Sequence, residues 1–297
     1  MLVRLLGTSA GGGLPQWNCG CENCTLARDE KLRRRAHSSV AVVGNEGSVL
    51  INAGPDFLSQ VDLLPRPSLQ DARRSPVAAV LLTNADLDHV LGLISMREGA
   101  ALHVYATDAV RQTLSKAFDI DSLLRSFTRL VWHDVQPDTP FFIDADSHRD
   151  IEIRAIFLPA GVPLFDRTNH AETGHSIAYA LHDLTTGKRL VVAPDVGEIT
   201  PELREALHAA DAVLLDGTFW SDEELQRIKP GARTSRAMGH VPIAEGSLDL
   251  LRSLKASHKS YFHINNTNPI LNPASLERSL VESAGIRVEE DGAEWIL

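Results

Sequence analysis

A short stretch in which an apolar strand gives way to a helix constrains this chain more than any other feature. Residues 77–82 are apolar and predict a buried strand, and residues 87–96 have the pattern of a helix. Asp88 and His89 therefore lie where the strand gives way to the helix, which is where α/β proteins gather functional groups. A carboxylate and an imidazole there can bind one metal ion, because the first supplies charge and the second a directional nitrogen.

The length and composition predict one soluble, globular domain over residues 1–297. Of the 297 residues, 43% are hydrophobic, which is enough to pack a core. The formal net charge of −10 argues against a nucleic-acid partner, because such partners normally require a basic face. Residues 1–7 are too short for a secretory signal, and no apolar run is long enough to span a membrane. The sequence therefore predicts a cytoplasmic protein without a membrane partner.

Three cysteines within six residues predict a metal site. Cys19, Cys21 and Cys24 are odd in number and too close together to cross-link a fold by disulfides. Their spacing, C-x-C-x-x-C, can place three sulfurs around one tetrahedral zinc ion. We expect a structural zinc loop near residues 17–25, since three thiolates and a fourth ligand leave no open position for catalysis. His37 is the nearest histidine in the sequence and Asn266 is a second candidate for the fourth ligand.

The rest of the chain predicts two strand-rich regions, each followed by helices, and hence two packed sheets with helices outside. Strands are expected over residues 3–6, 38–43, 48–52, 77–82, 102–106, 130–133, 151–157, 176–181, 189–193, 212–216 and 260–264. Helices are expected over residues 87–96, 107–117, 201–209, 221–228, 243–254 and 272–284. Residues 159–174 form a long loop that contains His170 and is followed by His175, so it is a candidate for a lid over a substrate.

Three further polar residues lie at the ends of predicted elements. Asp195 and His263 end predicted strands, and His240 lies just before a predicted helix. Strand exits meet at one edge of an α/β sheet. We therefore expect these side chains to lie near Asp88 and His89.

These residues, in this order, resemble the metallo-β-lactamase fold superfamily. The resemblance covers nearly the whole chain, through Gly7-Thr8-Ser9, Asp88-His89, Asp195, Gly239-His240 and His263. Within the superfamily, the chain most closely resembles the protein B family of pyrroloquinoline quinone (PQQ) biosynthesis, on residues 11–19, 83–89 and 262–269. The resemblance implies a mixed α/β (α+β) fold, a four-layer αββα sandwich.

The usual superfamily motif has the form Thr-His-x-His-x-Asp-His, whose first two histidines belong to one metal site and whose Asp-His belongs to a second. This chain has Asn84 and Asp86 at the positions of those two histidines. The resemblance therefore implies a single active-site metal, held by Asp88, His89, Asp195 and His263. Two carboxylates and two imidazoles with open positions form the ligand class of non-haem Fe(II), although zinc and manganese accept the same donors.

The resemblance also gives roles to residues around this site. His240 matches a position that often gives a proton to a leaving group, and here it is expected to orient the substrate or to move a proton. Asp86 is expected to support the ligands or to be an additional one, and His170 and His175 are candidates for the missing site. Relatives with a structural zinc have a histidine at the position of Asn266, so the fourth zinc ligand stays open.

The function implied by the resemblance is iron- and oxygen-dependent hydroxylation of the tyrosine ring of a PQQ precursor derived from tyrosine and glutamate. The partner would be this small-molecule or peptide-derived precursor. One alternative is a metal-dependent hydrolase of phosphodiesters or esters, which needs two metal ions. Another is a carrier of PQQ or its precursor for transport to the periplasm. A homodimer is compatible with the sequence, which does not decide the oligomeric state.

Overall fold

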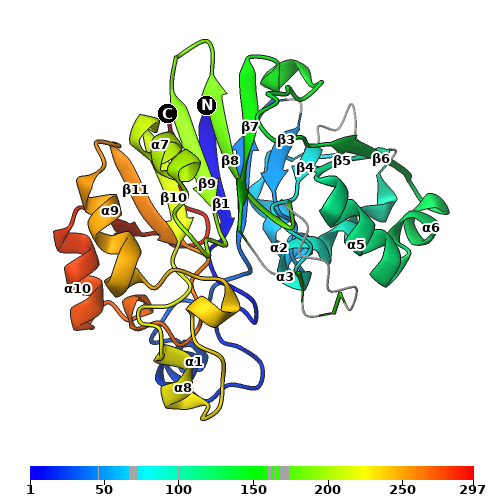
Figure 1. Cartoon of the computed structure of the whole chain (residues 1–297). Coiled ribbons are helices and arrows are strands. Elements are labelled where there is room, and N and C mark those ends of the chain that lie inside the picture. The colour runs from blue at the N-terminus through cyan, green and yellow to red at the C-terminus, as the bar shows by residue number, and fades with distance from the viewer. Residues whose placement is uncertain (46, 67–72, 100, 160–161, 164, 167–173) are drawn as a thin grey trace.

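Two β-sheets face each other in the computed structural model, with helices on the outer sides (Figure 1). The structure describes residues 1–45, 47–66, 73–99, 101–159, 162–163, 165–166 and 174–297. The first sheet has seven strands, in the order β13 (Glu294–Ile296), β1 (Leu2–Gly7), β2 (Ser39–Val43), β3 (Ser48–Ile51), β4 (Val77–Leu81), β5 (Ala101–Ala106) and β6 (Arg129–Asp134). The second has six, in the order β12 (Arg287–Val288), β11 (His258–Phe262), β10 (Ala212–Asp216), β9 (Arg189–Ala193), β8 (Ser176–Asp183) and β7 (Ile151–Leu158). The expected mixed α/β fold with two packed sheets is confirmed.

Helices cover both outer faces of the sandwich. The first sheet is covered by α2 (Phe57–Gln60), α3 (Leu87–Val90), α4 (Gly92–Ser95), α5 (Asp108–Phe118) and α6 (Ile120–Arg125). The second is covered by α7 (Pro201–Ala209), α9 (Leu248–Ser253) and α10 (Leu276–Ser283). The short helices α1 (Glu22–Arg28) and α8 (Glu224–Ile228) lie together at one end of the sandwich (Figure 1). None of the helices in the described ranges is long and apolar enough to cross a membrane.

The side chains of β10 show how the sequence fills both sides of the second sheet. Ala212 and Leu214 pack into the cluster between the two sheets, whereas Val213 and Leu215 pack into the cluster under the helices. Strands β9, β10 and β11 are parallel, so their carboxyl ends meet at the same edge. The polar residues that follow these strands are therefore brought together at that edge.

The helix expected over residues 87–96 is present but divided, because α3 and α4 are separate and a 3₁₀ turn over Met96–Glu98 follows them. The backbone of Ala53 interrupts the helix. Its N–H donates to the carbonyl of His89 at 2.8 Å, and its carbonyl accepts from the N–H of Gly92 at 2.9 Å. A side chain at position 92 would overlap the backbone of residues 53 and 54, so glycine is needed for this close approach.

The short elements near both ends of the chain were not expected from the sequence. Strands β12 and β13 have two and three residues, too few to show a pattern of their own, and β13 forms because it pairs with β1. Helix α1 lies in the region expected to be a cysteine loop. Much of the candidate lid over residues 159–174, including His170, lies outside the described residues.

His258, at the start of β11, is expected to make the fold sensitive to acid. Its ring stacks on Trp295 of β13 with ring centroids 3.8 Å apart, and Oγ of Ser260 lies 3.1 Å from its Nε2. Burial, assisted by Arg287, lowers the pKa of His258 to about 4, whereas an unfolded histidine has a pKa of about 6.5. The unfolded chain binds a proton there that the folded chain does not, so the free energy of unfolding falls as the pH drops through this range.

The variant His258→Phe keeps an aromatic ring against Trp295 but cannot bind this proton. We expect it to lose less stability than the wild type between pH 7 and pH 4.5, by about 2 to 3 kcal/mol. Urea unfolding of both proteins at the two pH values measures this difference. Equal losses in the two proteins would show that His258 does not carry the acid sensitivity.

Candidate metal centres

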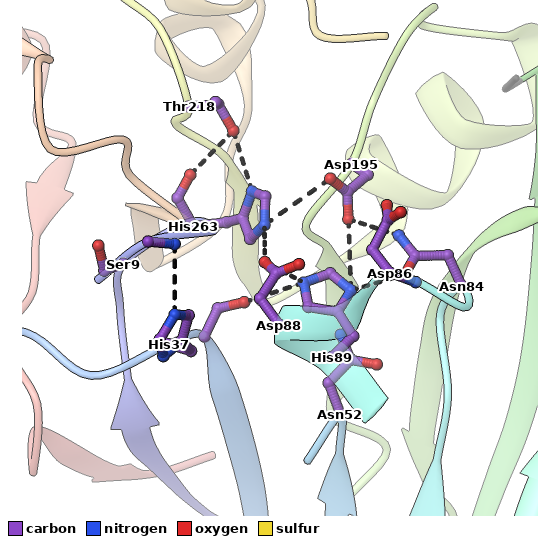
Figure 2. Close-up of polar contacts among 12 residues, drawn as sticks. Ser9, His37, Asn52, Asn84, Asp86, Asp88, His89, Asp195, Thr218 and His263 are labelled. Carbon is purple, nitrogen blue, oxygen red and sulfur yellow. Dashed lines mark hydrogen bonds and ion pairs between the residues drawn. The ribbon is translucent and has the colours of Figure 1, made fainter. Parts of the chain in front are cut away.

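Four side chains from both sheets converge at one edge of the sandwich (Figure 2). Asp88 and His89 lie in α3 after β4, Asp195 follows β9, and His263 follows β11. Nε2 of His263 lies 3.5 Å from Oδ2 of Asp88 and 3.7 Å from Oδ1 of Asp195. Nε2 of His89 lies 3.6 Å from Oδ2 of Asp88, and its Nδ1 lies 3.6 Å from Oδ2 of Asp195. The ligand atoms of Asp88, His89 and His263 are all within 4.8 Å of one another, close enough to share one ion.

The hydrogen bonding of His263 fits a metal at this position. Its Nδ1 lies 2.9 Å from Oγ1 of Thr218, and donation to that oxygen leaves Nε2 as an acceptor. Nε2 is buried and has no hydrogen-bond partner within the described part of the chain. It faces the carboxylates of Asp88 and Asp195. A lone pair opposed by two negative groups is stabilised when a cation lies between them.

The pKa shifts of Asp88 and His263 indicate that this site favours positive charge beside the Asp88 carboxylate. Burial alone would raise the pKa of Asp88, but His89 and His263 hold it well below its usual range. Burial alone would lower the pKa of His263, but Asp195, Asp216 and Asp88 raise it well above its usual value. The pKa of His89 is lowered, chiefly by burial. An ionised Asp88 and a neutral His89 are the protonation states that metal ligation requires, and on His263 a metal ion would take the place of the proton on Nε2.

Asn84 and Asp86 occupy the positions of the superfamily's first two histidines. The side chain of Asn84 donates from Nδ2 to Oδ2 of Asp195 at 2.9 Å, and its Oδ1 lies 2.9 Å from Nδ1 of His89. Asn84 therefore orients two of the converging residues. Asp86 is not one of the closely spaced side chains that could share a metal ion. Burial together with Asp195 and Asp88 raises its pKa to about 7.

His240 is linked to His263 through the carboxylate of Asp216. Its Nδ1 lies 2.8 Å from Oδ2 of Asp216, the last residue of β10. The other oxygen of Asp216 accepts from Oγ1 of Thr218 at 2.6 Å, and that hydroxyl is the partner of His263. Burial opposes protonation of His240, but Asp216 and Asp195 outweigh it and raise the pKa. Asp216 thus orients His240 directly and His263 through Thr218.

Local backbone geometry fixes two of these contacts. His263 has a φ of 54° and Asn52, after β3, has a φ of 64°, a left-handed conformation that costs a residue with a side chain roughly 1 kcal/mol. Oγ1 of Thr218, which donates its proton to Asp216, accepts from Nδ1 of His263 and so helps to hold the ring in place. Asn52 accepts from the N–H of Thr83 at 2.9 Å, and Oγ1 of Thr83 lies 3.3 Å from Nδ1 of His89. The strained positions support the converging histidines.

The three cysteines form a second cluster, whose sulfurs lie within 4.8 Å of one another. Nδ2 of Asn266 lies 3.2 Å from Sγ of Cys19 and of Cys24, and 3.5 Å from Sγ of Cys21. Burial and the neighbouring thiols raise the pKa of Cys21 to about 12, whereas hydrogen bonds lower that of Cys19 despite burial. Thiols packed this closely are ionised together only beside a cation. A half-turn of the Asn266 amide would present its oxygen to the same ion.

His37 lies away from the sulfurs, with its ring nitrogens beside Asp56 and the backbone N–H of Gly12. His175 is buried directly before β8 and belongs to neither cluster. The hydroxyl of the next residue, Ser176, donates to the backbone carbonyl of Asp195 at 3.3 Å. The structure therefore brings Asn266 to the cysteines and leaves His37 and His175 outside both clusters.

Comparison with known proteins assigns the family. The model of the Beta-lactamase superfamily domain matches residues 48–264. Coenzyme PQQ synthesis protein B of Klebsiella pneumoniae subsp. pneumoniae is 37% identical over 300 residues, which cover 98% of this chain and 97% of that protein. The crystal structure of zinc-bound PqqB from Methylobacterium extorquens is 34% identical, with a TM-score of 0.88 and all of both chains covered.

The chain belongs to the coenzyme PQQ synthesis protein B (PqqB) family. A diphosphatase of the PhnP family, 21% identical with a TM-score of 0.68 over 99% of this chain and 96% of that one, shares the fold of this chain. The PqqB of M. extorquens binds zinc. In the described part of this PqqB-family chain, three groups of side chains have the spacing of metal ligands: the three cysteines, Asp88–His89–His263, and Asp195–His240–His263, which shares His263 with the second.

Three residues that support the centre were not identified from the sequence of this PqqB-family member. Asp216 and Thr218 follow the apolar run of β10, as polar residues follow many strands, so nothing set them apart. The sequence marks Asn84 only as the absence of a histidine, yet its amide contacts two of the converging side chains. Position at a strand exit was the one available signal, and it does not show which way a side chain points.

Proposed function

We propose that this PqqB-family chain acts in PQQ biosynthesis as an iron- and oxygen-dependent hydroxylase of a tyrosine-containing precursor. The observation that supports the proposal is the donor set of the centre: two carboxylates and two imidazoles converge there, and the buried Nε2 of His263 lacks a partner among the described residues. This is the ligand class that holds non-haem iron. Iron(II) held there would supply electrons for the activation of dioxygen.

In this proposal, Asp88, His89, Asp195 and His263 hold the metal, and the remaining polar residues act on the substrate or on the ligands. Asn84 keeps Asp195 and His89 in place through its two hydrogen bonds. His240 moves a proton near the substrate, because Asp216 holds its Nδ1 at 2.8 Å and stabilises its charged form. The substrate is a small-molecule or peptide-derived precursor.

The donor set of the centre favours one metal over two. The second group with metal-ligand spacing, Asp195–His240–His263, shares His263 with the first. Asn84 and Asp86 stand at the positions of the two histidines that would complete another site. Two-metal hydrolysis needs two complete ligand sets. We therefore expect one metal ion at this centre and one zinc at the cysteines, as measured by metal analysis of the purified protein.

Oxygen consumption tests the proposed reaction. Iron-loaded protein, given a Glu-Tyr peptide and a reductant, is expected to consume dioxygen and to form a product with one more oxygen atom on the ring. Zinc-loaded protein is the matched control, because zinc has no redox chemistry and should support no consumption.

Three results would count against the proposed reaction or favour another function. Absence of both oxygen consumption and hydroxylated product with iron-loaded protein would overturn the hydroxylase proposal. Tight binding of PQQ without turnover, unaffected by replacement of His89, would favour a carrier. Two metal ions at the centre together with phosphodiester cleavage would favour a hydrolase.

A further inference from the structure

His37 and Asp56 form a close pair beside the proposed metal centre and belong to neither cluster of ligating atoms. Nδ1 of His37 lies 2.6 Å from Oδ2 of Asp56, and the backbone N–H of His37 donates to the same oxygen at 2.8 Å. The side chain of Gln60 donates to the carbonyl of His37 at 2.7 Å. Both the backbone and the ring of His37 are therefore fixed.

The other ring nitrogen of His37 accepts a hydrogen bond from the glycine loop over residues 11–13. The N–H of Gly12 donates to Nε2 of His37 at 3.3 Å. Because Nε2 accepts this bond, Nδ1 carries the proton that is given to Asp56. A Cβ atom placed on Gly13 would lie 3.6 Å from Cε1 of His37, in ordinary van der Waals contact. The loop is thus anchored to the imidazole ring by the hydrogen bond from Gly12.

The same glycine loop passes close to a proposed metal ligand, with room for little more than a methyl group between them. A Cβ atom placed on Gly11 would lie 3.4 Å from both the carboxyl carbon and Oδ2 of Asp88. On the other side, a Cβ atom on Gly54 would overlap the carbonyl oxygen of Asp88 and lie 3.0 Å from Cβ of His37. Figure 2 shows His37 beside Asp88, consistent with these contacts.

We propose that His37, held by Asp56, is a positioning residue that keeps the loop over residues 11–13 against Asp88 and so fixes the orientation of that carboxylate. Three consecutive glycines have more backbone freedom than any other tripeptide. The hydrogen bond from Gly12 is a specific anchor that restricts this freedom. Ser38, the next residue, has its Oγ 3.3 Å from Nε2 of His89, so one segment supports both neighbouring ligands. The inference rests on the proposed metal centre.

Metal affinity tests this role. Titration of Mn²⁺ into protein with zinc at the cysteines, followed by electron paramagnetic resonance of free Mn²⁺, gives the dissociation constant at the centre. His37→Ala is expected to raise this constant about 10- to 100-fold, the usual range for residues that orient a ligand. His37→Gln keeps an acceptor for Gly12 and a donor for Asp56, so we expect a smaller rise, less than about 10-fold.

Controls separate positioning from a general loss of structure. His103→Ala removes a half-buried histidine of β5 whose ring partner is His133, and it should leave Mn²⁺ affinity unchanged. The zinc content at the cysteines and the circular dichroism of His37→Ala should match those of the wild type. If His37→Ala does not fold, Asp56→Ala takes its place, because it frees the ring of His37 without removing it.

The outcomes distinguish this inference from the proposed centre. Wild-type protein that binds no Mn²⁺, or binds it equally well with Asp88→Ala, would show that the proposed centre is wrong. Wild-type binding that depends on Asp88 but is unchanged in folded His37→Ala or Asp56→Ala would overturn the positioning role alone. A weaker affinity in His37→Ala that His37→Gln partly restores would support it.

Discussion

Replacing Asp88 with alanine is expected to remove one metal ion per chain and to lower oxygen consumption more than about 100-fold, the upper end of the loss seen when a residue only supports a ligand. Oδ2 of Asp88 lies within 3.6 Å of the nearest nitrogens of both His89 and His263, so its removal takes a negative charge from the middle of the donor set. Of the two carboxylates beside both imidazoles, only Asp195 would then remain to attract a cation. Metal analysis and an oxygen electrode measure the two effects.

A matched control for this substitution is Asp62→Ala, which removes an exposed carboxylate that belongs to none of the groups of possible metal ligands. It should retain two metal ions per chain and full oxygen consumption. The zinc at the cysteines should also remain in Asp88→Ala, since that cluster uses other residues. An Asp88→Ala protein with an unchanged metal count would show that the ion is bound elsewhere.

Replacing Cys24 with serine is expected to produce the largest loss of stability. The thiol of Cys24 is fully buried, and its Sγ lies 3.2 Å from the Asn266 amide and 3.3 Å from the N–H of Gln16. Arg28 donates to the carbonyls of Cys19 and Gln16, so the segment before α1 is tied to the same cluster. If zinc is present at 1,000 times its dissociation constant, losing it lowers the free energy of unfolding by about 4 kcal/mol.

Chemical unfolding and zinc analysis of Cys24→Ser measure this effect. Thr25→Ser is the matched control, because it replaces the neighbouring residue of α1 and leaves all three sulfurs in place. It should keep zinc and lose little stability. A Cys24→Ser protein with wild-type stability would argue that the cysteines do not hold a structural ion. Wild-type stability that is insensitive to a chelator would argue the same.

Much of the fold could be predicted because its strands are long enough to show their period. The bounds of α7 and β10 match those expected from the sequence, and the hairpin of β2 and β3 follows its β-branched runs. The helix after β4 could not be predicted correctly. The pattern of residues 87–96 is helical, but the hydrogen bonds from Ala53 that divide it come from another part of the chain.

The candidate site could be predicted as a set of ligand types, and less well as an arrangement. The order of Asp88-His89, Asp195 and His263 along the chain indicated a metal, and the structure places the four together. His37 was considered for zinc because it is the histidine nearest to the cysteines in sequence. Its ring instead lies between Asp56 and the glycine loop. Distance along a chain does not measure distance in space.

The sequence by itself determined the alternation of strands and helices, the cysteine spacing and the loss of two histidines at Asn84 and Asp86. These features depend on residue type and local period, which are readable without neighbours. Only the tertiary structure decided which polar side chains meet. The parallel strands β9, β10 and β11 end at one edge, so Asp195, Asp216 and His263 lie together beside α3. The reason is physical, because a ligand set is fixed by distances and hydrogen bonds between segments far apart in the chain.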